Sequence, residues 1–240
     1  MNKKRLRTFA VAGMIVAGYI AVKLGAAKIE ASLPASGGEL NQKRVIVLDA
    51  GHGGMDGGCS TADGVPEKGI NLNILLAVRD MLTACGYEVE VTRDKDMSIH
   101  DNGITGIAAQ KNSDMDNRLA IFNKYSDAIC ISIHQNQYIT PGAKGAQMFF
   151  SPQNPDSQPL AQIMQTRFVQ NLQPDNTREI KQCGSELFLC HFCKNPTVMI
   201  ECGFLSNPDE AKLLVTDDYQ KKVAFTIFSG INEFAAQAQN

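Results

Sequence analysis

The 240-residue sequence has no internal repeat and no compositional bias, with 20% charged and 44% hydrophobic residues. This ordinary mixture excludes a disordered chain, a collagen and a coiled-coil rod. Beyond its first 27 residues the sequence also lacks any run rich in lysine or arginine, so nucleic acid is not expected as a partner. The roughly 200 residues that remain are enough for one compact domain with a full-size hydrophobic core.

Motifs of several enzyme classes are missing as well. The sequence contains no G-x-S-x-G elbow of serine hydrolases, no G-x-x-x-x-G-K-[ST] phosphate loop and no H-E-x-x-H helix of zinc peptidases. Gly51-His52-Gly53 follows a predicted strand and suggests a dinucleotide-binding loop, but the third glycine of that fingerprint falls on Asp56. The motifs therefore support none of these four classes.

The N-terminus differs from the rest of the chain. Four basic residues within the first seven precede an uncharged, apolar run over residues 8–22. The basic flank and the length of this run are typical of a secretory signal and short for a full membrane span. We expect an exported protein in which residues 1–27 are a cleaved signal peptide or a retained membrane anchor. The alternative is a buried N-terminal helix.

The sequence after this segment predicts a linker and then a folded domain. Residues 28–43 are mostly small and polar, which is typical of a linker, and residues 44–240 are expected to form the domain. Residues 1–27 carry five positive charges and no negative ones, so removing them moves the net charge from −2 to −7. A domain of that charge has no electrostatic attraction to an anionic surface. Retention at the membrane or an accessory recruiting protein would therefore have to bring it to any anionic partner.

Apolar strands alternate with amphipathic helices along residues 44–240. Strands are predicted at residues 45–48, 87–92, 128–133, 145–151, 186–189 and 197–200. Helices are predicted at residues 70–85, 118–125, 159–172, 207–214 and 219–235, and a long polar surface loop at 97–117. Unbroken apolar strands are typical of sheets buried on both faces. We therefore expect a single-domain α/β fold, with a twisted, mostly parallel sheet and helices on both faces.

Reactive side chains follow three of these strands. His52, His134 and Glu201 each come directly after a predicted strand, and ligands bind at the carboxyl ends of strands in open α/β sheets. Glu67, just before the first long helix, can reach the same edge. His52, Glu67 and His134 would then bind zinc and leave a fourth position for water, with Glu201 off the metal as general base. Taken singly, each of these residues could instead pack in the core or cap a helix.

With these residues in place, the sequence resembles the zinc-dependent N-acetylmuramoyl-L-alanine amidases of the amidase-3 type. The matching segments are VIVLDAGHGGMDGG, VPEKGINLNILLAV, VTRDKD, RLAIFNKYSDAICISIHQN and PTVMIECGFLSNPDEAKLL. The resemblance implies that His52, Glu67 and His134 are the zinc ligands and that Glu201 is the catalytic glutamate. It also implies a twisted α/β sheet and hydrolysis of the amide bond between N-acetylmuramic acid and the L-alanine of peptidoglycan stem peptides.

Two segments narrow the resemblance further. GAQMFFSPQNPDSQPLAQ and ECGFLSNPDEAKLL are most similar to the sporulation and germination amidases of the spore cortex, which implies a role in forming muramic-δ-lactam. The alternatives are a peptidoglycan-binding protein that has kept the fold but not the chemistry, and a zinc peptidase. The presence of all four site residues argues against a binding protein, and the missing H-E-x-x-H argues against a peptidase.

Three further residues are candidates for substrate binding. Arg118 lies in a matching segment and can bind a carboxylate of the stem peptide or form an ion pair with Asp114 or Asp116. Asn136 and Asn207 can hydrogen-bond the substrate or cap the loops that carry the zinc ligands.

The seven cysteines do not form the framework of a small disulfide-rich domain. Cys85 and Cys130 lie in apolar, periodic segments, which predicts that both are in the core. In an exported protein Cys183 can pair with Cys190 or with Cys193, and the sequence does not choose between them. The C-x-x-C of residues 190–193 alone is a weak indication of a second metal site.

Overall fold

The structure, a computed structural model, describes residues 44–237. The predicted signal peptide or anchor over residues 1–27 and the linker over residues 28–43 lie outside the described residues. Within the described part of the chain, no helix combines the length and the apolar composition needed to cross a membrane.

Six strands form one sheet with the order β2-β1-β3-β6-β4-β5. The strands are β1 (Ile46–Ala50), β2 (Val89–Val91), β3 (Ile129–Asn136), β4 (Gln147–Phe150), β5 (Lys181–Gln182) and β6 (Thr197–Phe204). All pairings are parallel except that of β4 with β6. The predicted α/β fold with a mostly parallel sheet is therefore confirmed.

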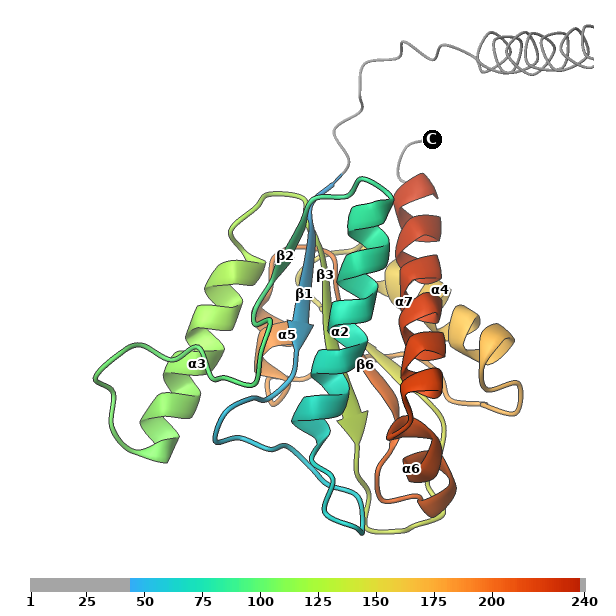
Figure 1. The fold of residues 1–240 in the computed structure, drawn as a ribbon. Helices are drawn as coiled ribbons and strands as arrows, with labels where there is room; N and C mark the ends of the chain where they lie inside the picture. Colours follow the sequence, from blue (N-terminus) through green and yellow to red (C-terminus); the bar gives the residue numbers. More distant parts are fainter. Residues whose placement is uncertain (1–43, 238–240) are drawn as a thin grey trace, which may run out of the picture. The chain divides into compact units, whose positions relative to one another are not determined.

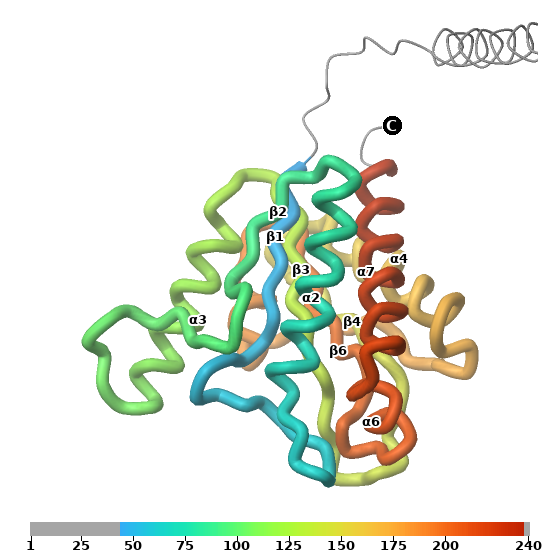
Figure 2. Tube along the Cα trace, viewed as in Figure 1, coloured from blue at the N-terminus to red at the C-terminus, as the bar shows by residue number. Residues whose placement is uncertain are grey.

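Helices cover both faces of this sheet (Figure 1). They are α2 (Glu67–Ala84), α3 (Ile107–Phe122), α4 (Ser157–Asn171), α5 (Phe188–Phe192), α6 (Pro208–Leu214) and α7 (Asp217–Gln237). α2, α4 and α7 pack together over one face, and α3 and α5 contact each other over the opposite face. The tube in Figure 2 shows α2 and α7 side by side, with α2 next to β1 and β3.

The alternation of side chains along β1 divides the core between the two faces. Ile46 and Leu48 belong to the larger cluster under α2, α4 and α7, whereas Val47 packs with Phe122 of α3. All three side chains are fully buried. This is why the first strand is an unbroken apolar run rather than an alternation of apolar and polar residues.

Two predicted elements are wrong. Residues 107–117, assigned to a polar loop, are the first part of α3, whose buried residues include Ser113 and Arg118. A helix that buries polar side chains lacks the apolar period from which helices are predicted. The strand expected at residues 186–189 is also absent: α5 begins at Phe188, and β5 lies earlier, at Lys181–Gln182. The three consecutive apolar residues at positions 187–189 do not distinguish a strand from one helical turn.

The two cysteines expected in the core have different positions. Cys130 on β3 is buried, as predicted. Cys85 is exposed, because it is the C-terminal cap of α2, where the chain leaves the helix through Gly86 at φ 77°. The apolar period of α2 ends at Leu82, so Cys85 no longer lies on the buried side.

Candidate active site

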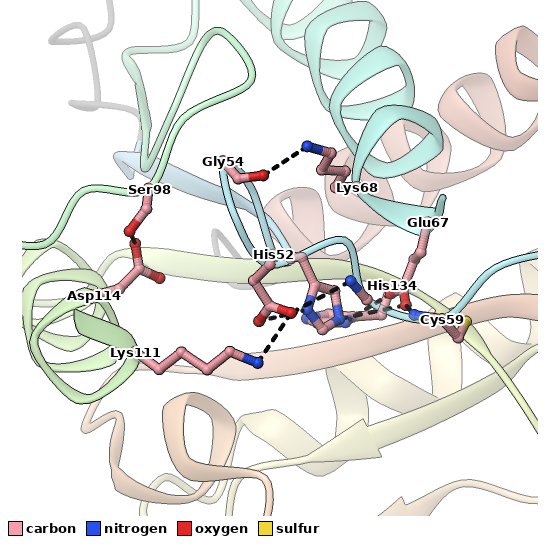
Figure 3. A network of polar contacts seen from close by, with 12 residues as sticks. His52, Gly54, Cys59, Glu67, Lys68, Ser98, Lys111, Asp114 and His134 are labelled. Carbon is pink, nitrogen blue, oxygen red and sulfur yellow. Dashed lines mark hydrogen bonds and ion pairs between the residues drawn. The ribbon is translucent and has the colours of Figure 1, made fainter. Parts of the chain in front are cut away.

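His52, Glu67 and His134 meet at the edge formed by the carboxyl ends of β1 and β3 (Figure 3). Their candidate ligand atoms all lie within 4.8 Å of one another. Nε2 of His52 is 3.3 Å from Oε2 of Glu67, and Nδ1 of His134 is 3.1 Å from Oε1 of the same carboxylate. Two imidazoles and one carboxylate are a donor set that suits zinc with an open position.

Each of these residues is positioned by a different element. His52 is two residues beyond the end of β1, and Glu67 is the first residue of α2 rather than a residue before it. His134 and Glu201 lie within β3 and β6 rather than after them, and their Cα atoms are register partners. The parallel pairing of these strands therefore brings together residues that are far apart in the sequence.

Gly51 makes room for His134. A Cβ atom on Gly51 would lie 2.1 Å from Cε1 of the His134 ring, so no side chain fits at this position while the ring is in place. Gly58 packs equally closely on the other side of the cluster, where a Cβ atom would lie 2.5 Å from Oε2 of Glu67, and its φ of 70° also favours glycine. Gly51 and Gly58 therefore make room for the histidine–carboxylate cluster.

The backbone of His52 is held in an unfavourable conformation. Its φ of 65° is in the left-handed region, which costs a residue with a side chain about 1–2 kcal/mol. Two buried arginines hold the carbonyl groups of this loop. Nη2 of Arg118 donates to His52 O at 2.7 Å, and Nη2 of Arg93 donates to Gly51 O at 3.1 Å. These contacts offset the cost and fix the backbone that carries His52.

The side chain of Arg118 is therefore part of the folded core of the domain. It forms the ion pair with Asp114 that the sequence analysis gave as the alternative to substrate binding. Its side chain is 2% exposed, with Nη1 2.5 Å from Asp49 Oδ1 and Nε 2.6 Å from Asp114 Oδ2. Burial favours the neutral form of Asp49, but the positive charges of Arg118 and His134 and the hydrogen bonds from Ser132 and Thr92 together outweigh this effect and lower the pKa of that carboxyl group. The guanidinium of Arg118 is thus bound by buried carboxylates and backbone carbonyls, and its binding of a substrate carboxylate stays a prediction.

Replacement of Arg118 by methionine is expected to lower the free energy of unfolding by about 3–5 kcal/mol, because Asp49 would remain buried without its partner. Urea unfolding of the two proteins measures this difference. Arg79→Met is the matched control: Arg79 pairs with Asp80 at the surface, where an ion pair contributes about 0–1 kcal/mol. Equal losses in the two variants would contradict the structural role of Arg118.

Asn207 is also occupied in the structure. Its Oδ1 accepts hydrogen bonds from two backbone N–H groups in the first turn of α6, and its Nδ2 donates to two carbonyls of the loop before β4. It is the N-cap of α6, which is the second of the two roles expected for it. Asn136 lies at the end of β3, where its Oδ1 accepts a hydrogen bond from Gln137 N at 2.8 Å, and it stays a candidate for substrate binding.

Charges around Glu67 favour a cation at this point. Burial favours the neutral carboxyl group, but hydrogen bonds from His134 and His52 hold the pKa of Glu67 well below its usual range. Burial lowers the pKa of His52, yet the hydrogen bonds and charges of Glu67 and Asp56 outweigh this and raise it to about 9. The cluster thus stabilises positive charge, which a metal ion can supply in place of the imidazole protons.

Asp56 is a site residue that the sequence did not reveal. Its Oδ2 lies 3.1 Å from Nδ1 of His52, which leaves Nε2 of the same ring directed at Glu67. Lys111 of α3 in turn lies 3.1 Å from Oδ1 of Asp56 (Figure 3). A carboxylate on the far nitrogen of a ligating histidine fixes the tautomer and the orientation of the ring. In the sequence, Asp56 was notable only because it breaks a glycine fingerprint.

Asp56→Asn is expected to weaken metal binding by about 10- to 100-fold, since a neutral amide oxygen replaces the charged carboxylate that orients the imidazole. Competition with a chelator of known affinity measures the loss. Asp63→Asn, an exposed change in the same region, should leave the affinity unchanged. If both variants bind the metal as tightly as the parent protein, Asp56 does not orient His52.

Glu201 has the properties of an acid–base group. Burial raises its pKa to about 7, and while the positive charges of His134 and His52 oppose this shift, the negative charge of Glu67 adds to it. Its Oε2 is buried and has no hydrogen-bond partner among the described residues. Because buried polar atoms are rarely left unpaired, this oxygen is available to a substrate or a water molecule. A pKa near neutrality suits a group that takes up and returns a proton.

A cleft of about 250 Å³ opens beside the two histidines. One side is formed by the loop of His52 and by α3, and the other by residues 186–190, which include the start of α5. The floor contains Ser132 and Met199 on β3 and β6. The cluster therefore lies beside a hollow that can receive an extended polymer strand or its peptide.

An α/β sheet with a His–Glu–His cluster and an unpaired carboxylate oxygen beside a cleft defines a class, the metal-dependent hydrolases. The described residues include three that could hold such a metal ion. The chain matches the family described as N-acetylmuramoyl-L-alanine amidase (Amidase_3) over residues 46–233. The chain belongs to this family and is an amidase.

Two similar proteins refine the comparison. The chain is 36% identical to the germination-specific N-acetylmuramoyl-L-alanine amidase of Bacillus subtilis (strain 168), over 83% of this chain and 81% of the relative. It also resembles the solved structure of the CwlD amidase from Clostridioides difficile in complex with the GerS lipoprotein. That match has a TM-score of 0.77 and 34% identity, covering 80% of this chain and 98% of the other. Both agree with the resemblance found in the sequence.

A more distant relative gives the same family. The chain is 26% identical to the amidase AmiA of Escherichia coli (strain K12), over 79% of this chain and 75% of that protein. Relatives named as cell-wall amidases act on peptidoglycan, which lies outside the cytoplasmic membrane, and the predicted export of this chain agrees with that location.

Proposed function

We propose that the chain is a zinc amidase in which His52, Glu67 and His134 hold the ion and Glu201 is the general base. The single observation that carries this assignment is the convergence of three ligand atoms within 4.8 Å, next to a strand position occupied by Glu201. When bound there, zinc would lower the pKa of a water molecule to about 7 and polarise the carbonyl oxygen of the scissile amide.

The protein's own residues supply orientation and proton transfer. Asp56 and the backbone carbonyl contacts of Arg93 and Arg118 hold His52 in place. Glu201 takes a proton from the attacking water and returns it to the nitrogen of L-alanine as the carbon–nitrogen bond breaks. The products are a free lactyl carboxylate on the glycan and a stem peptide with a free amino group.

The reaction is tested with purified protein, zinc and isolated peptidoglycan. Mass spectrometry should detect free stem peptides and intact glycan strands. Release of disaccharides would identify a glycosidase instead, and cleavage between amino acids would identify a peptidase. Binding to peptidoglycan without any product would support the alternative, a wall-binding protein with the same fold.

The biological setting that we propose is the spore cortex, with the amidase preparing muramic acid for muramic-δ-lactam formation. The similarity to a germination-specific amidase supports this setting. Cortex from spores of a strain without the gene should lack muramic-δ-lactam, as measured in muropeptide digests. Normal δ-lactam content would place the enzyme in other cell-wall remodelling.

We further propose that residues 1–27 direct export and that an accessory protein brings the domain to its substrate. The similarity to an amidase solved in complex with a lipoprotein supports a partner of that kind. Intact-mass measurement of the native protein separates the two possibilities for the N-terminus: a first residue at Lys28 means a cleaved signal peptide. Full activity of a purified chain starting at Ser32, with no partner added, would rule out the need for a partner.

A further inference from the structure

We propose that Cys183 and Cys190 are a site of oxidative modification, where a disulfide bond joins the end of β5 to α5 and fixes one wall of the active-site cleft. The two sulfur atoms are 2.9 Å apart. Bonded sulfur atoms are about 2.05 Å apart, so a small movement closes the link. Both side chains are buried, at 2% and 1% exposure.

The surroundings of the two sulfur atoms hold them together. Sγ of Cys183 lies 3.2 Å from Phe150 O, and Sγ of Cys190 lies 3.5 Å from Phe149 O. Both contacts are to consecutive carbonyl groups of β4, so one strand positions both thiols. The side chains also share one small hydrophobic cluster with Met199.

The structure decides between the two pairings that the sequence left open. Cys193, the alternative partner of Cys183, packs in a different cluster with Cys130, Val47 and Phe122. A bond between Cys183 and Cys193 would require moving one of them out of its cluster, which is costly in a closely packed core. The geometry therefore favours Cys183–Cys190.

Exchange requires an oxidant to reach the two buried thiols, and local opening of the five-residue helix α5 provides that access. The hydrogen bond from Cys190 lowers the pKa of the Cys183 thiol, although burial opposes this effect, so Cys183 is the more reactive of the two. The oxidant is a disulfide, either a low-molecular-weight one or that of a thiol oxidoreductase. The Cys183 thiolate attacks one of its sulfurs and displaces a thiolate, and the Cys190 thiolate then displaces the second. Two protons and two electrons leave the cysteine pair, and the oxidant becomes two thiols.

The consequence concerns the cleft. The segment between the two cysteines, residues 184–189, supplies Glu186, Leu187, Phe188 and Leu189 to the cleft wall opposite His52. α5 is only five residues long and so has little stability of its own. A covalent link across this segment would hold the wall in one position. Disulfides persist outside the reducing cytoplasm, where an exported amidase acts.

The test is a peptide map of the full-length protein in two samples, one as isolated and one after equilibration with oxidised glutathione. In both samples, acid first stops any further thiol exchange. After alkylation, trypsin releases residues 182–194, which contain Cys183, Cys190 and Cys193. We expect this peptide to be lighter by two hydrogens and alkylated only on Cys193. Chymotryptic cleavage after Phe188 should give two fragments that separate only on reduction. Alkylation of all three cysteines after equilibration, or a bond that includes Cys193, overturns the proposal.

Two variants and one further measurement complete the test. Cys193→Ser should retain the link and Cys183→Ser should lose it. Amide hydrogen exchange over residues 184–192 should be slower by about tenfold or more in the oxidised protein than in the reduced protein, with no such difference in Cys183→Ser. Equal exchange in oxidised and reduced parent protein would show that the link does not fix the wall. None of these readouts depends on zinc or on amidase activity, so they can fail or succeed separately from the proposed function.

Discussion

Glu201→Gln is expected to lower kcat by about 10²- to 10⁴-fold while the zinc content stays that of the parent protein. Glutamine has nearly the same shape as glutamate but cannot accept the proton of the attacking water. Since Glu201 is not one of the three clustered ligand residues, its loss should leave the ion in place. Release of stem peptides from peptidoglycan gives the rate, and elemental analysis gives zinc per chain.

The control for this variant is Glu88→Gln. Glu88 is an exposed carboxylate just before β2, at the amino ends of the parallel strands, whereas the cluster lies at their carboxyl ends. The control should change neither quantity. One outcome would contradict the assignment of the two carboxylates. If Glu201→Gln loses zinc while Glu67→Gln keeps it, their roles are reversed. The environments in the structure argue against that reversal, because Glu67 contacts both histidines whereas Oε2 of Glu201 has no hydrogen-bond partner among the described residues.

The sequence was sufficient to find the four residues of the candidate site because each of them is adjacent to a strongly patterned element. His52 follows the apolar strand β1, and His134 and Glu201 end apolar runs that became β3 and β6. In a parallel sheet these ends share one edge, so the convergence could be predicted without knowing any side-chain contact. The exact ends of the strands could not be predicted, because the sequence does not distinguish a polar residue inside a strand from a polar residue just after it.

The supporting residues were not predictable in the same way. Arg118 could be assigned to a substrate carboxylate or to a protein carboxylate, because its buried partner Asp49 is 69 positions earlier in the chain. Only the packing of α3 against β1 brings the two together. The same packing places Lys111 beside Asp56, on a helix whose first half was taken for a loop. A buried polar network has no periodic signature, so it becomes visible only in three dimensions.

His134→Ala is expected to abolish zinc retention. Removal of a residue that only orients a ligand lowers metal affinity by about 10- to 100-fold, and removal of the ligand itself should lower it further. The variant leaves one imidazole and one carboxylate, and two ligands do not make a structural or catalytic zinc site. The variant also removes the ring that packs on Gly51. The loop that carries His52 therefore loses a packing contact in addition to the loss of a zinc ligand. Elemental analysis after dialysis should find zinc in the parent protein and almost none in the variant.

His191→Ala is the matched control for His134→Ala, because His191 lies on α5 outside the cluster. It should keep the zinc, and circular dichroism should show that both variants remain folded. His52→Ala should behave as His134→Ala does, since each histidine supplies one of the three ligand atoms. If His134→Ala and His52→Ala both retained about one zinc per chain, the ion would be held elsewhere. The cysteines of residues 190–193 would then be the first alternative, and their alkylation should release it.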